Sequence, residues 1–365
     1  MSDPLVRSTS YGVLLTMDGW LQRLLVAGCW LYLLGVVGVW LLIRWAGDHW
    51  WVATVMMFGP RWVWLLPLLV LTPISLMYRQ HRRTLLPLLL AAAVVVFCTM
   101  NFVIPRSGWF SQSSTRFRVL SCNVEGDRGG PAALHRLILK HQPDAVALQE
   151  CFHWDNEQLA RIFPGDWHVR RAGSLLIASP HQIIETHEHR HSRSPSPGTR
   201  INGLYCLIDD PLGPVGVCSI HLRTPREGLY TVLDRRIGLS PGRSAAVTEE
   251  IEWRRVESED LSSWLRAMQP PTVVAGDFNM PVESRIYRRY WSSWENTFDQ
   301  SGWGFGATKI TRVRGIRYGL RIDHILAGPK FRTTGAWVID PIGSDHLPLM
   351  ADITRSGVSD GTGGR

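Results

Sequence analysis

The sequence predicts an α/β domain that follows a group of membrane-spanning helices. Two observations lead to this prediction: long uncharged apolar segments occupy the first hundred residues, and short apolar segments alternate with helical patterns from residue 116 onward. A helix needs about 20 apolar residues to cross a bilayer core of ~30 Å. Short apolar runs that end at Gly, Asn or Asp are instead typical of buried strands. A chain of 365 residues has room for both parts.

Three apolar segments are predicted to span a membrane, at residues 24–43, 62–77 and 85–104. The first and third carry no charge, and the second contains Pro67 and Pro73, so it is predicted to be tilted or kinked. Three runs in succession argue against a single cleavable signal peptide.

The charges around these segments predict the orientation of the chain. Arginines precede the first segment and separate the second from the third: Arg7, Arg23, Arg79, Arg82 and Arg83. Positive loops stay in the cytoplasm, so residues 1–23 are predicted to be cytoplasmic. Three crossings then place the following domain on the outer face, although Arg106, Arg116 and Arg118 oppose this mildly. We therefore expect a multi-pass protein of the cell membrane with an extracytoplasmic domain.

Beyond the apolar region the sequence predicts a linker at 105–115, an α/β domain at 116–354 and a disordered Gly-rich tail at 355–365. The net charge is +8, and only three of the 39 basic residues are lysine. Arginine favours bidentate contacts with phosphate, but a general preference for arginine with positive membrane flanks gives the same count. Six cysteines do not form a dense disulfide framework. Cys206 and Cys218 flank a predicted hairpin turn, where they are either linked or merely buried.

The stretch from Val273 to Asn279 is the centre of the α/β domain. An apolar strand runs into Gly276, and the i, i+2 spacing then keeps Asp277 and Asn279 on one side of an extended chain. Polar side chains also stand at the ends of five other apolar segments: Asn123, Glu150, His221, Asp323, and Asp345 with His346. Taken singly, Asn123 is also explained as a turn residue and His221 as a strand-end histidine.

These residue types indicate metal-assisted hydrolysis of a phosphoester. Carboxylates such as Glu150 and Asp345 bind hard divalent cations through oxygen. The cation polarises a phosphoryl oxygen, and a histidine held by a carboxylate moves protons near neutral pH. The sequence contains no Ser or Cys nucleophile motif, so direct attack by water is expected.

The same segments resemble the motifs of the endonuclease/exonuclease/phosphatase superfamily. Six of them occur in the order that the family shows: Ser121–Asn123, Leu148–Glu150, Ile220–Leu222, Gly276–Asn279, Arg321–Ile325 and Ser344–Pro348. The resemblance implies a four-layer α/β/β/α sandwich with the site at one edge of its two sheets.

The resemblance also implies roles for the site residues. Three residues would bind Mg²⁺ or Mn²⁺: Asn123, Glu150 and Asp345. Asp277 would orient or deprotonate the attacking water, and Asn279 and His221 would hydrogen-bond phosphoryl oxygens. His346 would carry a proton or bind phosphate, with Asp323 fixing its tautomer.

Other residues bear on the substrate. Arg223 and Arg226 follow His221 and would clamp a second phosphate or an anionic head group, or are simply exposed loop arginines. The chain departs from the family in having Pro180 where an arginine is frequent, and His324 where a tyrosine is frequent.

The apolar segments limit the class of substrate that we expect. Their combination with this domain resembles a bacterial membrane-bound subgroup that includes a teicoplanin-resistance protein. That resemblance implies hydrolysis of a lipid-linked phosphate at the outer membrane face, with the bilayer as partner. The alternatives are a tethered nuclease acting on extracellular nucleic acid and a non-catalytic membrane scaffold, which would require missing site residues. No obligate protein partner is evident.

Overall fold

A computed structural model describes most of the chain: residues 19–77, 81–106, 116–126, 128, 130–191, 200–233, 242–269, 272–313 and 315–356. The chain forms two compact units. The first contains the residues up to Ile43 together with Arg61–Asn101, and the second contains Arg44–Pro60 and the chain from Phe102 onward. Most of the predicted cytoplasmic N-terminus, of the 105–115 linker and of the C-terminal tail lies outside the described residues.

The first unit is helical and apolar. Its elements are α1 (Gly19–Ala46, which runs into the second unit), η1 (Arg61–Leu65), α3 (Leu68–Leu76), α4 (His81–Ala93) and the π-helical η2 (Val94–Thr99). Two helices are long and apolar enough to cross a membrane, Gly19–Ala46 and Arg82–Thr99. A pair bent by 91°, Trp51–Phe58 with Arg61–Leu76, makes a third if it is one span.

The third predicted span, at residues 85–104, ends earlier in the structure than the sequence indicated. It stops at Thr99 rather than Ile104, and Asn101 follows with a positive φ of 56°, which no helix accommodates. Val103 then pairs with Gly304 through two backbone hydrogen bonds within the second unit. Apolar character alone did not distinguish a membrane helix from a chain segment that packs on a protein surface.

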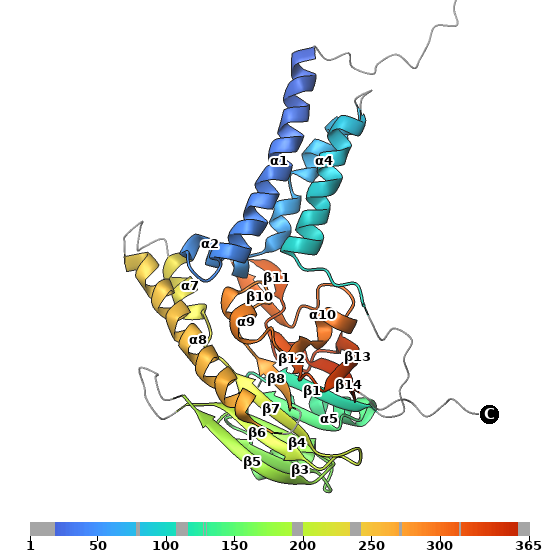
Figure 1. The fold of residues 1–365 in the computed structure, drawn as a ribbon, viewed down its shortest axis with the longest axis vertical. Helices are drawn as coiled ribbons and strands as arrows, with labels where there is room; N and C mark the ends of the chain where they lie inside the picture. The colour runs from blue at the N-terminus through green and yellow to red at the C-terminus, as the bar shows by residue number, and fades with distance from the viewer. Residues whose placement is uncertain are drawn as a thin grey trace, which may run out of the picture. The chain divides into compact units, whose positions relative to one another are not determined.

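Two six-stranded sheets form the body of the second unit (Figure 1). One sheet has the order β13-β14-β1-β2-β4-β3, with β13 (Phe331–Val338), β14 (Leu349–Arg355), β1 (Phe117–Asn123), β2 (Ala145–Gln149), β4 (Leu175–Ser179) and β3 (His168–Ala172). The other has the order β5-β6-β7-β8-β12-β9, with β5 (Ile183–Arg190), β6 (Ile201–Ile208), β7 (Val215–His221), β8 (Thr272–Asp277), β12 (Asp323–Ala327) and β9 (Glu295–Asn296). A separate hairpin joins β10 (Lys309–Val313) to β11 (Ile316–Leu320).

The cores confirm the predicted four-layer sandwich. Along β8, Val273 and Ala275 belong to the core between the sheets, whereas Val274 belongs to the core on the outer face, as the two-residue period of a strand requires. The outer face of this sheet packs on α8 (Gly242–Ala267) and α9 (Arg285–Tyr290), and that of the other sheet on α5 (Pro131–His141) and α6 (Asn156–Ile162). Two shorter helices, α7 (Arg226–Leu233) and α10 (Thr297–Ser301), also belong to the unit.

Parallel pairing brings the strand ends of the site to one edge. β1 pairs in parallel with β2, and β7 with β8, so residues at their carboxyl ends lie together. Gly276 permits the second pair: its φ is +150°, and a Cβ at this position would lie 2.0 Å from the carbonyl oxygen of Ile220. Only glycine fits there.

The two hairpin cysteines are not linked. Cys218 pairs with Tyr205 rather than with Cys206, a register shift of one residue. Such a shift places side chains on opposite faces of a sheet. Cys206 lies in the core between the sheets, Cys218 in the core beneath α8, and both thiols are free.

An unexpected element of the second unit is the loop that follows α1. It contains α2 (Trp51–Phe58), and Trp51 and Val55 pack against the core beneath α8 and α9. Within it, Asp48 is buried and accepts hydrogen bonds from Ser284 Oγ at 2.6 Å and from the Ile286 backbone N–H at 3.2 Å. The sequence had indicated only a short connection between two membrane spans.

Candidate active site

Asn123 joins residues of the two sheets at the site edge. Its Nδ2 donates to Glu150 Oε1 at 2.8 Å and to Asp277 Oδ2 at 3.1 Å. Its Oδ1 accepts the backbone N–H of Glu125 at 3.0 Å, which fixes the orientation of the amide. Two carboxylates from different sheets therefore converge on one amide.

Two non-glycine residues of the site have left-handed backbone conformations. Glu150 has a φ of 61° and Asn279 a φ of 51°. Such conformations cost free energy in residues other than glycine, and they are enriched at functional sites. Asp277 Oδ1 supports the turn by accepting the Asn279 backbone N–H at 2.8 Å, while Asn279 Nδ2 donates to the Leu222 carbonyl at 2.9 Å.

A carboxylate holds the buried His346 in one orientation. Its Nδ1 lies 3.0 and 2.9 Å from the two carboxylate oxygens of Asp323, and this contact leaves Nε2 at 3.8 Å from Asp277 Oδ2. Asp323 is itself anchored, since its backbone N–H donates to Thr308 Oγ1 at 3.1 Å. The histidine and carboxylate that the motifs paired are thus in contact.

The environment raises the pKa values of both Asp277 and His346. Burial and the charge of Asp323 raise the pKa of Asp277 to about 7. Burial lowers the pKa of His346, but the charges of Asp323 and Asp277 outweigh it and raise that pKa to about 9. A carboxylate that titrates near neutrality beside a protonated imidazole suits proton transfer.

The pKa of His221 is shifted in the opposite direction. Burial and the neighbouring Arg200 lower the pKa of His221 to about 3, so its imidazole is neutral near pH 7. Its Nε2 lies 3.6 Å from Glu150 Oε1 and 3.7 Å from Asp277 Oδ2. Arg200 donates to the His221 carbonyl at 3.0 Å, which places a guanidinium beside the site.

The side chains at this edge suit a hard divalent cation. Ligand atoms of Glu150, His221 and Asp277 lie within 4.8 Å of one another, and the same holds for Asp277, Asp323 and His346. One oxygen of Asp345, Oδ1, is buried without a hydrogen-bond partner among the described residues. Carboxylate oxygens in this number favour Mg²⁺ or Mn²⁺ over softer metals.

The structure brings most of the predicted site residues together. Asn123, Glu150, His221 and Asp277 form one contact network, and Asn279, Asp323 and His346 adjoin it through Asp277. Asp345 lies beside His346, at 3.8 Å from its Nε2, but its other oxygen is paired with Lys309.

The two arginines predicted to bind phosphate differ in their surroundings. Arg223 donates to both carboxylate oxygens of Glu250, at 2.7 and 2.8 Å, so it would have to leave that pair to reach a substrate. Arg226 is exposed. For both residues a phosphate-binding role stays a prediction.

Sequence reasoning missed Arg200 and Lys309. Lys309 is one of only three lysines in an arginine-rich chain, and this rarity was the available signal. Arg200 stands in a polar segment just before β6, and nothing in its sequence neighbourhood indicates proximity to His221.

Comparison with known proteins identifies the class of this fold and site. The model of the Endonuclease/Exonuclease/phosphatase family matches residues 120–346. The chain belongs to this family, as its motifs indicated, and it is a metal-dependent phosphohydrolase. No curated protein matches the chain.

Several solved structures resemble it. A family protein from Leptotrichia buccalis has 17% identity and a TM-score of 0.47, and the match covers 65% of this chain and 99% of that one. A family protein from Bacteroides vulgatus has 16% identity and a TM-score of 0.49, over 67% and 100% of the two chains. A 3'-5' exonuclease from Neisseria meningitidis has 18% identity and a TM-score of 0.49, over 65% and 100%.

Proposed function

We propose that this protein is a membrane-anchored phosphoesterase that hydrolyses a lipid-linked phosphate at the outer membrane face, with Mg²⁺ or Mn²⁺ as its metal. The observation that carries the proposal is that the loop following α1, Arg44–Pro60, belongs to the same compact unit as the site residues. The catalytic unit is therefore built partly from a segment that separates, in the sequence, the two apolar helices Gly19–Ala46 and Arg82–Thr99.

This shared unit supports the proposed topology. Arg44–Pro60 and the chain from Phe102 onward must lie on the same side of a membrane because they pack together. An even number of crossings must then separate them, which agrees with the two predicted spans in between. The positive-inside rule assigns that side to the outer face.

The side chains at the site edge would divide the chemistry among them. Glu150 and Asp345, with Asn123 beside them, would hold the cation, which when bound polarises a phosphoryl oxygen and offsets its charge. Asp277, with its raised pKa, orients a water molecule and accepts its proton. Neutral His221 donates a hydrogen bond from Nε2 to the phosphoryl group. Protonated His346 supplies a positive charge and a proton, with its ring held by Asp323.

Tethering favours a lipid substrate over a soluble one. A site fixed at a bilayer meets head groups at high effective concentration. The catalytic unit also exposes large aromatic side chains: Trp45, Trp50, Trp303 and Phe305. Exposed tryptophans are favoured at membrane interfaces.

A substrate panel on the full-length protein in lipid nanodiscs tests this function. With Mg²⁺ present, we expect release of phosphate or a phosphorylated head group from polyprenyl diphosphate, phospholipid or sphingomyelin. The same panel includes inositol phosphates and plasmid DNA. Chelation and Asp277→Ala should each abolish the activity, while Asp166→Ala, an exposed site in the same unit, should retain it. Cleavage of DNA without any lipid turnover would establish the nuclease alternative instead.

A further inference from the structure

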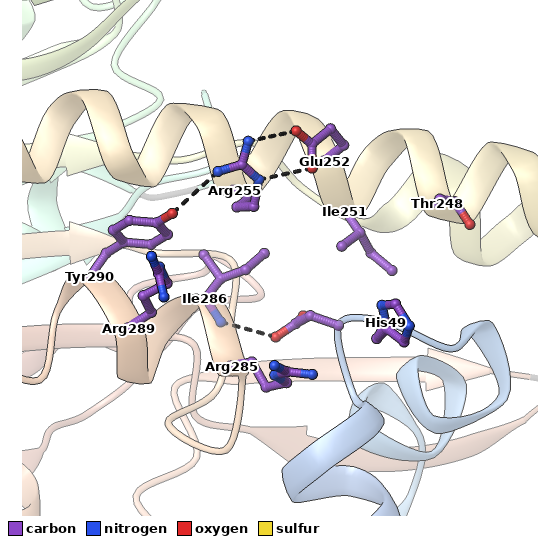
Figure 2. Close-up of a pocket in the computed structure, with 10 residues that line it drawn as sticks. His49, Thr248, Ile251, Glu252, Arg255, Arg285, Ile286, Arg289 and Tyr290 are labelled. Atoms are coloured by element: carbon purple, nitrogen blue, oxygen red, sulfur yellow. Dashed lines mark hydrogen bonds and ion pairs between the residues drawn. The ribbon is translucent and has the colours of Figure 1, made fainter.

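A cavity of about 470 Å³ lies within the second unit, between the loop after α1 and the helices α8 and α9 (Figure 2). Its walls carry Asp48 and His49 from the loop, Glu252 and Arg255 from α8, and Arg285 and Arg289 from α9. None of these residues belongs to the candidate active site. The volume falls within the range of small-ligand sites, roughly 300 to 1,000 Å³.

The two acidic residues in the wall are already compensated. Arg255 pairs with both oxygens of Glu252, with Nε–Oε2 at 2.9 Å and Nη2–Oε1 at 2.6 Å. Asp48 accepts two hydrogen bonds, as described above, and Arg254 Nη1 lies 3.8 Å from its Oδ1. Neither carboxylate is therefore available to neutralise a further cation.

The remaining basic residues of the wall have no acidic partner within the described part of the chain. Among the described residues, the side chain of Arg285 hydrogen-bonds only to the Trp45 backbone carbonyl, at 3.0 Å, and that of Arg289 lies over the Tyr290 ring at 5.7 Å without a hydrogen bond. Both arginines and His49 are exposed, and no described carboxylate pairs with them. Figure 2 shows their side chains around the same space. The cavity thus has an excess of positive charge and free N–H donors, which is the chemistry that binds phosphate.

We propose that this cavity binds the phosphate of an anionic phospholipid head group and is a lipid site separate from the catalytic site. His49 follows the last residue of the apolar helix α1 by three positions, and the exposed Trp45 and Trp50 flank it in the sequence. A phosphate site next to the end of such a helix meets lipid head groups before it meets free phosphate. The occupied site would bridge the loop and the α8–α9 face.

Equilibrium binding to the full-length protein in neutral detergent tests the proposal. The probes are short-chain phosphatidylglycerol, short-chain phosphatidylcholine and inorganic phosphate, with chelator present to prevent turnover. We expect phosphatidylglycerol to bind more tightly than the other two probes. In the double variant Arg285→Gln with Arg289→Gln, its affinity should fall at least tenfold, since each lost charged hydrogen bond costs about that factor.

The matched control removes the same charge elsewhere in the unit. Arg170 on β3 and Arg332 on β13 are exposed, and Arg170→Gln with Arg332→Gln should leave phosphatidylglycerol affinity within about twofold. An equal loss in both double variants, or binding of inorganic phosphate as tightly as phosphatidylglycerol, would overturn the proposal. Should the double variant fail to fold, Arg289→Gln alone serves, because Arg289 makes no hydrogen bond among the described residues. A wild-type affinity in the folded Arg289 variant would then also count against the site.

Discussion

Both oxygens of the Asp323 carboxylate lie within hydrogen-bond distance of His346 Nδ1. Removal of the Asp323 carboxylate tests whether catalysis requires the His346 imidazole to be held in place and protonated. Asp323→Asn should lower kcat by about 10² to 10⁴, the usual contribution of a positioned acid or base. It should also lower the pKa of His346, because the opposing charge that raises that pKa is gone. A pH–rate profile measures both effects.

The control for this variant is Asp340→Asn, since Asp340 is exposed and pairs with the exposed Lys140. An Asp323→Asn enzyme with the wild-type rate and pH profile would show that the contact does not serve catalysis.

His324 predicts a pH dependence of stability. Its Nε2 donates to the Met280 carbonyl at 2.9 Å and its Nδ1 faces Asn296 Nδ2 at 3.2 Å, so the buried ring is neutral. Burial and the charge of Arg321 lower its pKa from 6.5 to about 4. The unfolded chain therefore binds the proton first as the pH falls. Stability from this group is complete above about pH 6.5 and lost progressively towards pH 4, by about 3 kcal/mol in total.

Denaturant unfolding between pH 7 and pH 4 measures this effect against His324→Gln. The variant is expected to be less stable at pH 7, yet to lose less stability on acidification than the wild type. Equal losses in the two proteins would exclude His324 as the titrating group.

At the element scale, the carboxylate of Asp48 connects the loop after α1 to α8 and α9. Asp48 and Arg254 are both buried, and Arg254 also donates to the backbone carbonyl of Asn279, at the candidate active site, at 3.2 Å. Asp48→Ala removes the one carboxylate that, among the described residues, forms an ion pair with the buried guanidinium, which should cost about 3 to 5 kcal/mol. Calorimetric unfolding should show a lower Tm, while Asp166→Ala, at an exposed position, should change it little.

Rescue by a second substitution makes the assignment specific. Arg254→Met in the Asp48→Ala background removes the isolated charge and should recover part of the lost stability. A double variant no more stable than Asp48→Ala would indicate that the hydrogen bonds to Ser284 and Ile286 dominate instead.

The elements differ in how well the sequence predicted them. β8 was evident because Val273, Val274 and Ala275 lead into a glycine and an acid, a local pattern that packing reinforces. The motifs then placed Glu150, Asp277 and His346 together, as the structure does. The loop Arg44–Pro60 was missed because its docking depends on Asp48 meeting residues more than 200 positions later, and no local pattern records such a contact. The pairing of Lys309 with Asp345 was missed for the same reason.

For the whole molecule, the proposed topology predicts which residues are reachable from outside the cell. Trp50 and Tyr230 are exposed residues of the second unit, and Arg82 is the exposed first residue of the candidate span Arg82–Thr99. Introduced cysteines at positions 50 and 230 should react with a membrane-impermeant maleimide in intact cells, and one at position 82 only after permeabilisation. The native Cys98 is only partly buried, so it should be replaced beforehand.

Two outcomes test separately the membrane orientation and the packing of the loop on the catalytic unit. Labelling of position 82 alone in intact cells would reverse the orientation but keep both parts of the second unit on one side. Different sides for positions 50 and 230 would contradict the packing of the loop on the catalytic unit.

The hydrogen bond between Asp48 and Ser284 joins residues 236 positions apart. During synthesis, the early half of this contact leaves the ribosome long before its partner exists. In the proposed topology, the loop waits at the outer membrane surface, with its acid still hydrated, until the later chain has been translocated. Completion of the enzyme would then depend on completion of its insertion, and a chain that stalls before α9 would lack the Ser284 and Ile286 partners of that acid.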